Sequence, residues 1–444
     1  MDIFGLLPGF GNLAFTIAAF VVALSVIVAV HEYGHYIVGR WSGIEAEVFS
    51  IGFGPVLFSR VDKRGTRWQV AALPFGGYVK FLGDSDASSV RSTPQDDPER
   101  ARHTMQGAPL WARSATVAAG PLFHFALSIL VFTGYFLIGG VAVDRPLVGE
   151  LKELPTVEAT ELRRGDLILA IDGTLTPDMP SFMRAVEAME PSDVLTYRVD
   201  RDGSEMDVSG PFPFPPLAET VQPQSAARDA GLRSGDLVLS IDGEDISAFR
   251  ELRERIAESA GAPVLMEVWR AGETFEVTLA ARSQDLPTAD GGFETRWLLG
   301  ITGGMVFETE TRRPGVIEAL GIGAERTVFI AQTSLSGLWH MITGAISSCN
   351  LSGPIGIAET SGAMAADGLA SFIWFIAVLS TAVGLINLFP IPVLDGGHLV
   401  FHAWEAVTGK PPSDRALQIL MALGLAMILS LMVFAVGNDL FCPR

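Results

Sequence analysis

Four long apolar stretches constrain this chain more than any other feature of its sequence. A helix needs about 20 apolar residues to span the roughly 30 Å of hydrocarbon in a bilayer. The stretches at 13–38, 115–138, 371–391 and 417–436 meet that length. Only 18% of the residues are charged, against about 25% in soluble domains. We therefore predict a polytopic α-helical membrane protein with four transmembrane helices, for which the lipid bilayer is part of the solvent.

The distribution of charge limits the partners and predicts the orientation. The formal net charge is −19, whereas nucleic-acid binding needs a basic stripe, so no nucleic-acid partner is expected. No Lys or Arg precedes the first span, ten lie between residues 40 and 113, and Lys410 and Arg415 lie between the third and fourth spans. Loops rich in basic residues stay in the cytoplasm. Both termini and the acidic middle are therefore expected on the outer side.

The chain has two cysteines, Cys349 and Cys442. Two thiols cannot make a cysteine-only zinc site, which takes four. Both fall on the expected outer side, where a disulfide can form, but we expect unpaired thiols.

The middle of the chain contains an internal repeat. Residues 162–173 read LRRGDLILAIDG, and residues 232–243 read LRSGDLVLSIDG. Each copy predicts a Gly-Asp turn, an alternating strand, an Asp-Gly turn, an amphipathic helix and a further strand. The helices are expected near 181–189 and 249–259, and the further strands near 195–199 and 264–269. Two matched copies favour two small domains of one fold, joined through the Pro-rich segment 211–216.

The cytoplasmic end of the first span carries His31, Glu32, Tyr33, Gly34 and His35. Positions i and i+4 share one face of a helix, so both imidazoles can reach one Zn²⁺, with Glu32 beside them as a general base. Ionisable residues are expensive in a membrane and are usually functional there. The pattern therefore predicts a catalytic zinc site.

A catalytic zinc takes three protein ligands and keeps one position for water. Asp395 ends the third predicted span on the same cytoplasmic side, and Pro390 and Pro392 break the helix before it. Asp395 is therefore the expected third ligand. His398 and His402 are further imidazoles nearby, and we rank both below Asp395.

These residues make the chain resemble the site-2 protease family of intramembrane zinc metalloproteases, close to its bacterial regulator of sigma-E protease group. The similar motifs are the HExxH at 31–35 and the run from Asn387 through Pro390 to Asp395. Segments 49–55, 73–80 and 351–356 are similar as well. The resemblance implies zinc binding by His31, His35 and Asp395, acid–base chemistry by Glu32, and substrate handling by Asn387 and Pro390.

One position departs from that family. Its second span usually carries Gly-Pro-x-x-Asn-Phe, whereas this chain has His124 in place of the Asn. His124 keeps a hydrogen-bonding group with a different geometry. It can take over the role of the Asn or approach the metal.

The two repeats resemble tandem PDZ domains of bacterial membrane proteases. The second copy keeps Ala-Gly-Leu at 230–232 before its turn, and the first copy is more divergent. The domains expected are a first membrane half at 1–140, PDZ-like domains at 141–215 and 216–285, a linker with an amphipathic interfacial helix at 286–370, and a second membrane half at 371–444.

Segment 48–59 is expected to be a membrane-associated β segment. Apolar residues alternate there, and glycines such as Gly54 let another backbone approach. An extended substrate can add to such an edge as a strand, with Phe53 and Gly54 beside it. The alternative is a juxtamembrane loop that only packs.

The resemblance implies an inner-membrane protease that cuts transmembrane segments, such as that of an anti-sigma factor after a first periplasmic cut. Such a substrate must be unwound, because a helix shields its own carbonyls. Two alternatives stay open. A membrane-anchored PDZ scaffold with a degenerate metal site predicts no zinc, and a transporter predicts repeated spans, which the hydropathy does not show.

Overall fold

The computed structural model describes residues 7–84, 98–155, 160–192, 194–288 and 293–442. Arg91, one of the ten basic residues counted above, lies outside these ranges. The contacts divide the chain into two compact units. The helical unit comprises the chain up to Phe136, Gly315–Thr343 and Leu351–Cys442, and the insert unit comprises Leu137–Pro314 and Gly344–Asn350.

Four helices in the described residues are long and apolar enough to cross a membrane, which confirms the four predicted spans. They are α1 (Leu7–Trp41), α3 (Leu110–Gly139), α9 (Leu369–Asn387) and α11 (Asp414–Phe441). The third ends at Asn387 rather than at residue 391. Pro390 and Pro392 cannot donate to a helix, and the chain turns there into a separate helix, α10 (Asp395–Thr408).

The helical unit also contains the long helix α7 (Val316–Ile342) and the shorter helices α2 (Pro98–Ala101) and α8 (Pro354–Ala366). Helix α8, which the sequence did not predict, packs on α1 so closely that a Cβ on Gly362 would lie 2.4 Å from Thr16 Oγ1. Asp439 of α11 holds the start of α8, because its carboxylate accepts hydrogen bonds from the backbone N–H groups of Gly353, Ile355 and Gly356. These contacts fix α8 between α1 and α11.

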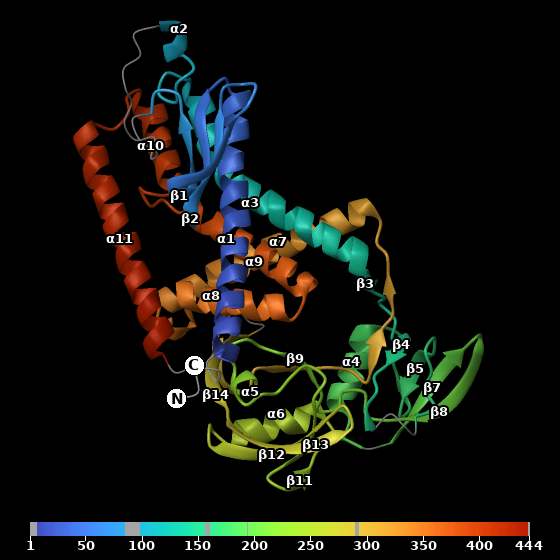
Figure 1. The fold of residues 1–444 in the computed structure, drawn as a ribbon. Helices are drawn as coiled ribbons and strands as arrows, with labels where there is room; N and C mark the ends of the chain where they lie inside the picture. The colour runs from blue at the N-terminus through green and yellow to red at the C-terminus, as the bar shows by residue number, and fades with distance from the viewer. Residues whose placement is uncertain (1–6, 85–97, 156–159, 193, 289–292, 443–444) are drawn as a thin grey trace. The chain divides into compact units, whose positions relative to one another are not determined.

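Strands β1 (Ala46–Val61) and β2 (Arg67–Phe81) form a long antiparallel hairpin beside α1 (Figure 1). Asp62 in its turn accepts hydrogen bonds from Tyr36 of α1 and from the Trp68 indole. Although burial alone would raise it, these bonds and two backbone N–H groups lower the pKa of Asp62. The ionised carboxylate thereby ties the hairpin to the helix that carries His31.

Both strands bend sharply, so that one run of β1 has partners on two sides. Residues 48–51 pair with 77–80 on one side and with 67–70 on the other, while 56–61 pair with 67–71. Gly52 makes the bend possible: its φ is +90°, and an added Cβ would lie 2.8 Å from Leu73 O. The run 48–51 is therefore interior, and the outer runs are 56–61 and 77–81.

The insert unit contains two copies of one arrangement, a four-stranded antiparallel sheet with a helix. The sheet orders are β6-β5-β7-β8 and β11-β10-β12-β13. The first copy comprises β5 (Leu167–Ile171), β6 (Thr174–Leu175), α4 (Met179–Ala188), β7 (Leu195–Arg201) and β8 (Ser204–Gly210). The second comprises α5 (Ala226–Asp229), β10 (Leu237–Ile241), β11 (Glu244–Asp245), α6 (Phe249–Glu258), β12 (Pro263–Arg270) and β13 (Glu273–Ala280). The predicted helices and strands of both repeats are thus present.

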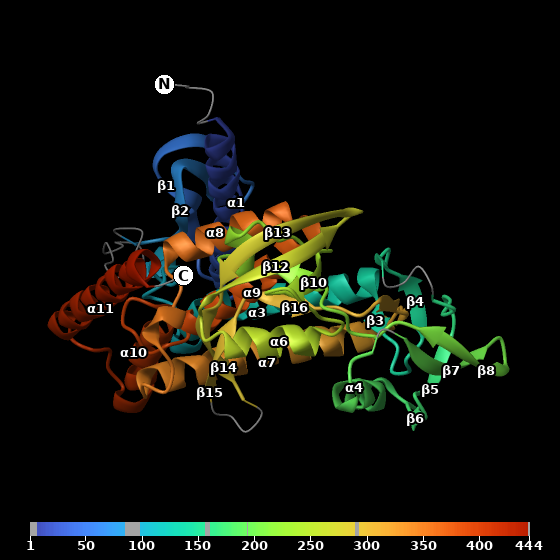
Figure 2. The ribbon, with the colours of Figure 1, turned by 90° about the horizontal axis from the view of Figure 1, so that it is seen from below.

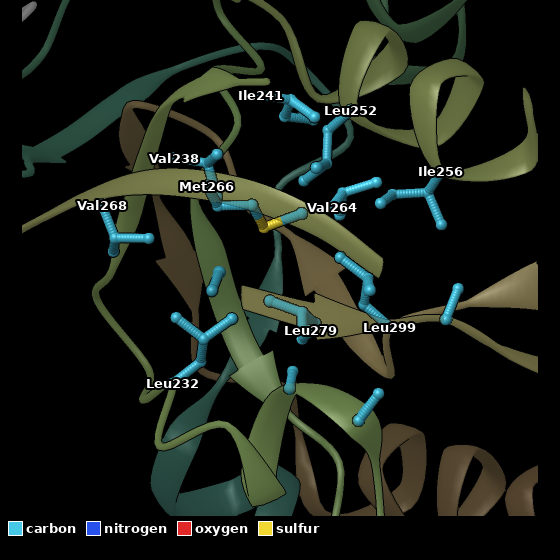
Figure 3. Close-up of a cluster of buried hydrophobic side chains, with 14 of the residues drawn as sticks. Leu232, Val238, Ile241, Leu252, Ile256, Val264, Met266, Val268, Leu279 and Leu299 are labelled. Atoms are coloured by element: carbon cyan, nitrogen blue, oxygen red, sulfur yellow. The ribbon is translucent and has the colours of Figure 1, made fainter. Parts of the chain in front are cut away.

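Each copy has its own hydrophobic core. In the second, Leu252 and Ile256 of α6 pack on Val264 and Met266 of β12, and Leu299 enters from much later in the chain (Figure 3). Figures 1 and 2 both place α6 against the strands of its own copy. Alternating strands and an amphipathic helix bury one face each, which is why the pattern predicted these elements.

The segment after residue 286, for which the sequence predicts a linker and an amphipathic helix, contains short strands before helix α7. Strand β16 (Ile301–Gly303) pairs with β9 (Ala218–Val221) of the second copy, and β17 (Phe307–Thr309) pairs with β4 (Val148–Leu151) of the first. Strands β18 (Thr311–Arg312) and β3 (Val141–Ala142) pair where the insert unit begins and ends. A hairpin, β14 (Arg282–Pro287) with β15 (Phe293–Leu298), precedes them. The returning chain therefore completes both repeat domains.

Cys349, in the short 3₁₀ helix Ser348–Asn350, and Cys442 are both disulfide-bonded, so the expectation of unpaired thiols is wrong. Pattern reasoning failed here because the positions of two cysteines in a sequence do not say whether their thiols come close enough to bond.

Candidate metal centre

His31 and His35 lie one turn apart on α1, and their rings meet at their Nε2 atoms. The two Nε2 atoms are 3.1 Å apart. Gly120 of α3 leaves room for the pair, because a Cβ there would lie 2.6 Å from the His35 ring and 2.7 Å from the His31 ring. A close helix crossing at a glycine therefore holds both imidazoles in place.

Asp395 reaches the same point from the first residue of α10. Its Oδ2 lies 3.3 Å from His31 Nε2, and its Oδ1 lies 3.5 Å from His35 Nε2. Gly396 allows the first turn of α10 to pack closely against the preceding turn of the chain, since a Cβ there would lie 2.3 Å from the carbonyl oxygens of Leu388 and Phe389. The helix break after α9 thus turns Asp395 inward.

The donor set fits a zinc ion. One ligand atom from each of His31, His35 and Asp395 can be chosen so that all lie within 4.8 Å of one another. Asp395 Oδ2 is buried and has no hydrogen-bond partner among the described residues, and a buried carboxylate oxygen is costly unless something satisfies it. Two imidazoles and a carboxylate are ligands that a catalytic zinc takes.

The outward nitrogens of the two imidazoles have protein partners. His35 Nδ1 lies 2.8 Å from the carbonyl oxygen of Thr116, and His31 Nδ1 lies 3.1 Å from His124 Nε2. Of the two roles open to His124, the structure shows contact with the far nitrogen of His31. His124 is not in the three-residue group. Sequence reasoning singled out this position only because it departs from the family pattern.

Glu32 lies beside the three residues in a cavity of about 580 Å³. Its carboxylate accepts a hydrogen bond from the backbone N–H of Val79 in β2. Gly77, Tyr78 and Val79 of the same outer run line the cavity. A Cβ on Gly77 would lie 3.2 Å from Glu32 Cγ, so the strand approaches the carboxylate closely. The cavity thus combines the three-residue group, a carboxylate and a strand edge that, in the part of the chain that the structure describes, has no strand on its outer side.

Further polar residues line the same cavity without belonging to the three-residue group. His398 and His402 lie on α10, and Glu405 pairs with Arg113 of α3. His402 Nδ1 lies 3.2 Å from Ser114 Oγ. Burial, followed by the positive charge of Arg113, lowers the pKa of His402 to about 4. Neither imidazole belongs to the three-residue group, in line with their rank below Asp395.

The four residues expected to handle substrate lie elsewhere in the described part of the chain. Asn387 ends α9, Pro390 is exposed in the turn after it, and Phe53 and Gly54 are exposed on β1. None of them is among the residues that line the cavity. Phe53 connects to it indirectly, because its ring stacks on Tyr78 with centroids 6.0 Å apart. The structure therefore brings together the predicted metal and base residues, but not these four.

Comparison with known proteins gives the class. Peptidase family M50 matches residues 19–431. The chain is 35% identical to a protein of Agrobacterium fabrum (strain C58) that carries the name of a zinc metalloprotease, over 97% of each chain. It is 32% identical to the Regulator of sigma-E protease RseP of Escherichia coli (strain K12), over 95% of this chain and 98% of that one. It is also 32% identical to RseP of Salmonella typhimurium (strain 14028s), over 96% and 99%.

The chain belongs to peptidase family M50, and within it to the site-2 protease family that its motifs predicted. It is a metalloprotease whose cofactor is zinc, which confirms the predicted enzyme class and metal. Its four apolar helices fit a multi-pass membrane protease.

Proposed function

We propose that this protein cleaves peptide bonds within transmembrane segments, with His31, His35 and Asp395 as its zinc ligands and Glu32 as its general base. The observation that carries the proposal is the convergence of two Nε2 atoms on a carboxylate whose buried Oδ2 has no hydrogen-bond partner among the described residues. Three protein ligands leave a fourth position for water.

The chain's own residues supply the rest of the chemistry. Zinc, when bound, acidifies its water and polarises a carbonyl. Glu32 follows His31 directly on α1 and lines the same cavity, so its carboxylate is placed to take the proton of that water and return it to the leaving amine. The Val79 N–H holds the carboxylate in one orientation.

The outer run 77–81 of β2 is the proposed docking edge for an unwound substrate. It pairs with β1 on one side only, and in the described residues no strand lies on its other side. An extended peptide added there would lie along Glu32, and main-chain hydrogen bonds hold such a strand without regard to its side chains. This run takes the place of 48–59, whose first half is interior.

Val79→Pro tests this edge. Proline removes the N–H that Glu32 accepts, so cleavage should fall strongly, whereas Val79→Ile, which keeps the N–H, should cleave at near the normal rate. Equal activity of the two variants would contradict the assignment.

The proposed substrates are single membrane-spanning regulators such as anti-sigma factors, cut after a first protease has trimmed them outside in regulated intramembrane proteolysis. The names of the RseP relatives support a sigma-factor pathway.

The two repeat domains are proposed to be PDZ-like, each completed by a strand from 301–309. We place them and both termini in the periplasm, with the metal centre near the cytoplasmic face of the inner membrane. The disulfide-bonded cysteines support that placement, because disulfides persist in oxidising compartments.

The test measures zinc content and cleavage together on the purified full-length protein, with a single-span peptide in liposomes as substrate. Glu32→Gln should keep zinc and lose cleavage by at least ~10²-fold, since only the base is removed. His31→Ala and Asp395→Ala should lose both. His398→Gln is the matched control, because it lines the same cavity outside the ligand group, and it should keep zinc. Zinc retained by Asp395→Ala would exclude this ligand set.

A further inference from the structure

Three side chains in contact, one of them the candidate metal ligand His31, link α1 to two other helices. His31 Nδ1 of α1 lies 3.1 Å from His124 Nε2 of α3, and His124 Nδ1 lies 3.0 Å from Ser380 Oγ of α9. His124 and Ser380 are fully buried, with 0% exposure. Bulk water therefore does not reach His124 or Ser380, and each ring nitrogen of His124 must be satisfied by its protein neighbour.

Ser380 has a second partner that sets the direction of the hydrogen bonds. Its hydroxyl donates to the carbonyl oxygen of His124 at 3.2 Å. A hydroxyl has one hydrogen, so Ser380 Oγ accepts at its other contact, and His124 Nδ1 carries the proton there. A neutral imidazole protonated at Nδ1 is bare at Nε2, so His124 Nε2 accepts from His31 Nδ1–H.

The same count of donors and acceptors determines the tautomer of His31. Its proton sits on Nδ1, facing His124, so its Nε2 presents a lone pair toward Asp395 and His35. His35 is held in the same tautomer by one direct contact. Its Nδ1 donates to the backbone carbonyl of Thr116, which can only accept. Both Nε2 lone pairs are thus aimed at one point, as a shared cation requires.

Close packing keeps the His124 ring in this position. Gly384 of α9 makes room for it, because a Cβ there would lie 2.7 Å from His124 Cβ. Ser128, one turn further along α3, has its single O–H within reach of two carbonyl oxygens, that of Ala377 at 2.8 Å and that of His124 at 3.0 Å, and lies at the same helix contact. Ser128 has no contact with either imidazole in these bonds, which makes it a matched control.

We propose that His124 is a positioning residue that, together with Ser380, fixes His31 in the tautomer whose Nε2 is free to bind zinc. The proposal rests on the proposed role of His31 as a ligand. A neutral histidine here does what a carboxylate or a backbone carbonyl usually does for a metal-bound imidazole. His124 acts through His31 and has no contact with substrate in this assignment.

The experiment measures the zinc affinity of the full-length protein by competition with a chromophoric chelator. His124→Leu removes the acceptor and should weaken zinc binding ~10–100-fold, the usual cost of losing such a partner. His124→Asn keeps a carbonyl acceptor and should recover part of the affinity. Ser380→Ala should weaken binding by less, because the His124 ring is then free to place its proton on either nitrogen. Ser128→Ala should leave the affinity unchanged.

A double variant separates positioning from packing. If Ser380 acts through the His124 ring, Ser380→Ala should cause no further loss of zinc affinity in a His124→Leu background. Wild-type affinity in His124→Leu, or equal losses in Ser380→Ala and Ser128→Ala, would overturn the proposal. The serine comparison decides it even if His124→Leu does not fold. His31→Ala in the same assay keeps the two proposals apart: retained zinc there refutes the ligand set itself.

Discussion

The guanidinium of Arg113 and the carboxylate of Glu405 form a two-point ion pair that joins α3 to α10, with N–O distances of 2.6 and 3.1 Å. Both side chains are less than one-fifth exposed. Helix α10 begins at Asp395 and α3 carries Gly120, so this pair ties together two of the elements that surround the metal centre.

Breaking the Arg113–Glu405 pair should therefore disturb the metal centre from a distance. Arg113→Gln or Glu405→Gln leaves a largely buried charge without its partner, and hydrogen bonds to charged groups are worth about 1.5–3 kcal/mol. Each single variant should lower the midpoint of thermal unfolding and slow cleavage. The double variant should lose less than the sum of the two, because no charge is left unpaired. Simple additivity of the three unfolding measurements would show that the pair does not couple the helices.

Gly120 should not tolerate a methyl group. In Gly120→Ala the new Cβ would lie within 2.7 Å of both imidazole rings, which must then move apart. We expect loss of bound zinc and of cleavage, measured by metal analysis and peptide assay. Gly134→Ala on the same helix is the control, because nothing lies within 4 Å of its Cβ. Equal zinc content in the two variants would mean that the rings adapt.

Each repeat domain depends on a buried aspartate. Asp236 accepts two hydrogen bonds from Arg270, at 2.6 Å each, and one from the backbone N–H of Arg233, and it is 1% exposed. Asp166 makes the same contacts with Arg201 and Arg163. Removing one partner of such a pair costs about 3–5 kcal/mol.

Asp236→Asn should accordingly speed hydrogen exchange in the second repeat domain, and Asp166→Asn in the first. Hydrogen exchange of the intact protein reports the two domains separately. Asp207→Asn serves as the control, since its pair with Arg198 is more than half exposed and should contribute at most ~1 kcal/mol. Faster exchange after the control substitution would show that the assay responds to charge alone.

Deletion of the insert tests whether it excludes substrates. Removal of residues 148–309 keeps β3 and β18, whose pairing brings the cut ends together for a short linker. A shorter deletion of 150–281 would remove β9, the partner of β16, and cut through β4, the partner of β17. If bulk on the outer side restricts entry, the deleted protein should cleave substrates that still carry a large outer domain. Loss of cleavage of a trimmed substrate, at equal expression, would instead indicate recruitment.

The parts of the site that were predictable from sequence are those encoded by local spacing. His31 and His35 follow from helical periodicity, and the repeats follow from their alternation. The contact between His124 and Ser380 was not predictable, because it joins residues 256 apart and depends on how α3 meets α9. Asp395 was predictable in part. A motif marks it, but only the turn after α9 brings it to the histidines.

The returning strands were missed for a related reason. Strands β16 and β17 have three residues each and carry no alternation long enough to recognise. Their partners lie far back in the chain, so nothing local marks them as strands. The proposed docking edge is 77–81 rather than 48–59, because the bends in β1 and β2 follow from glycine conformations. An alternating pattern does not tell which side of a strand is occupied.

Because β3 pairs with β18, the two points at which the chain enters and leaves the insert unit are neighbours. Residues inserted between these two neighbouring points can be lengthened, shortened or exchanged in evolution while the helices that bear the proposed metal ligands keep their sequence and their crossings. The matched motifs at 162–173 and 232–243 are what a duplication within the insert would produce. Selection on what reaches the enzyme could thus proceed separately from selection on its chemistry.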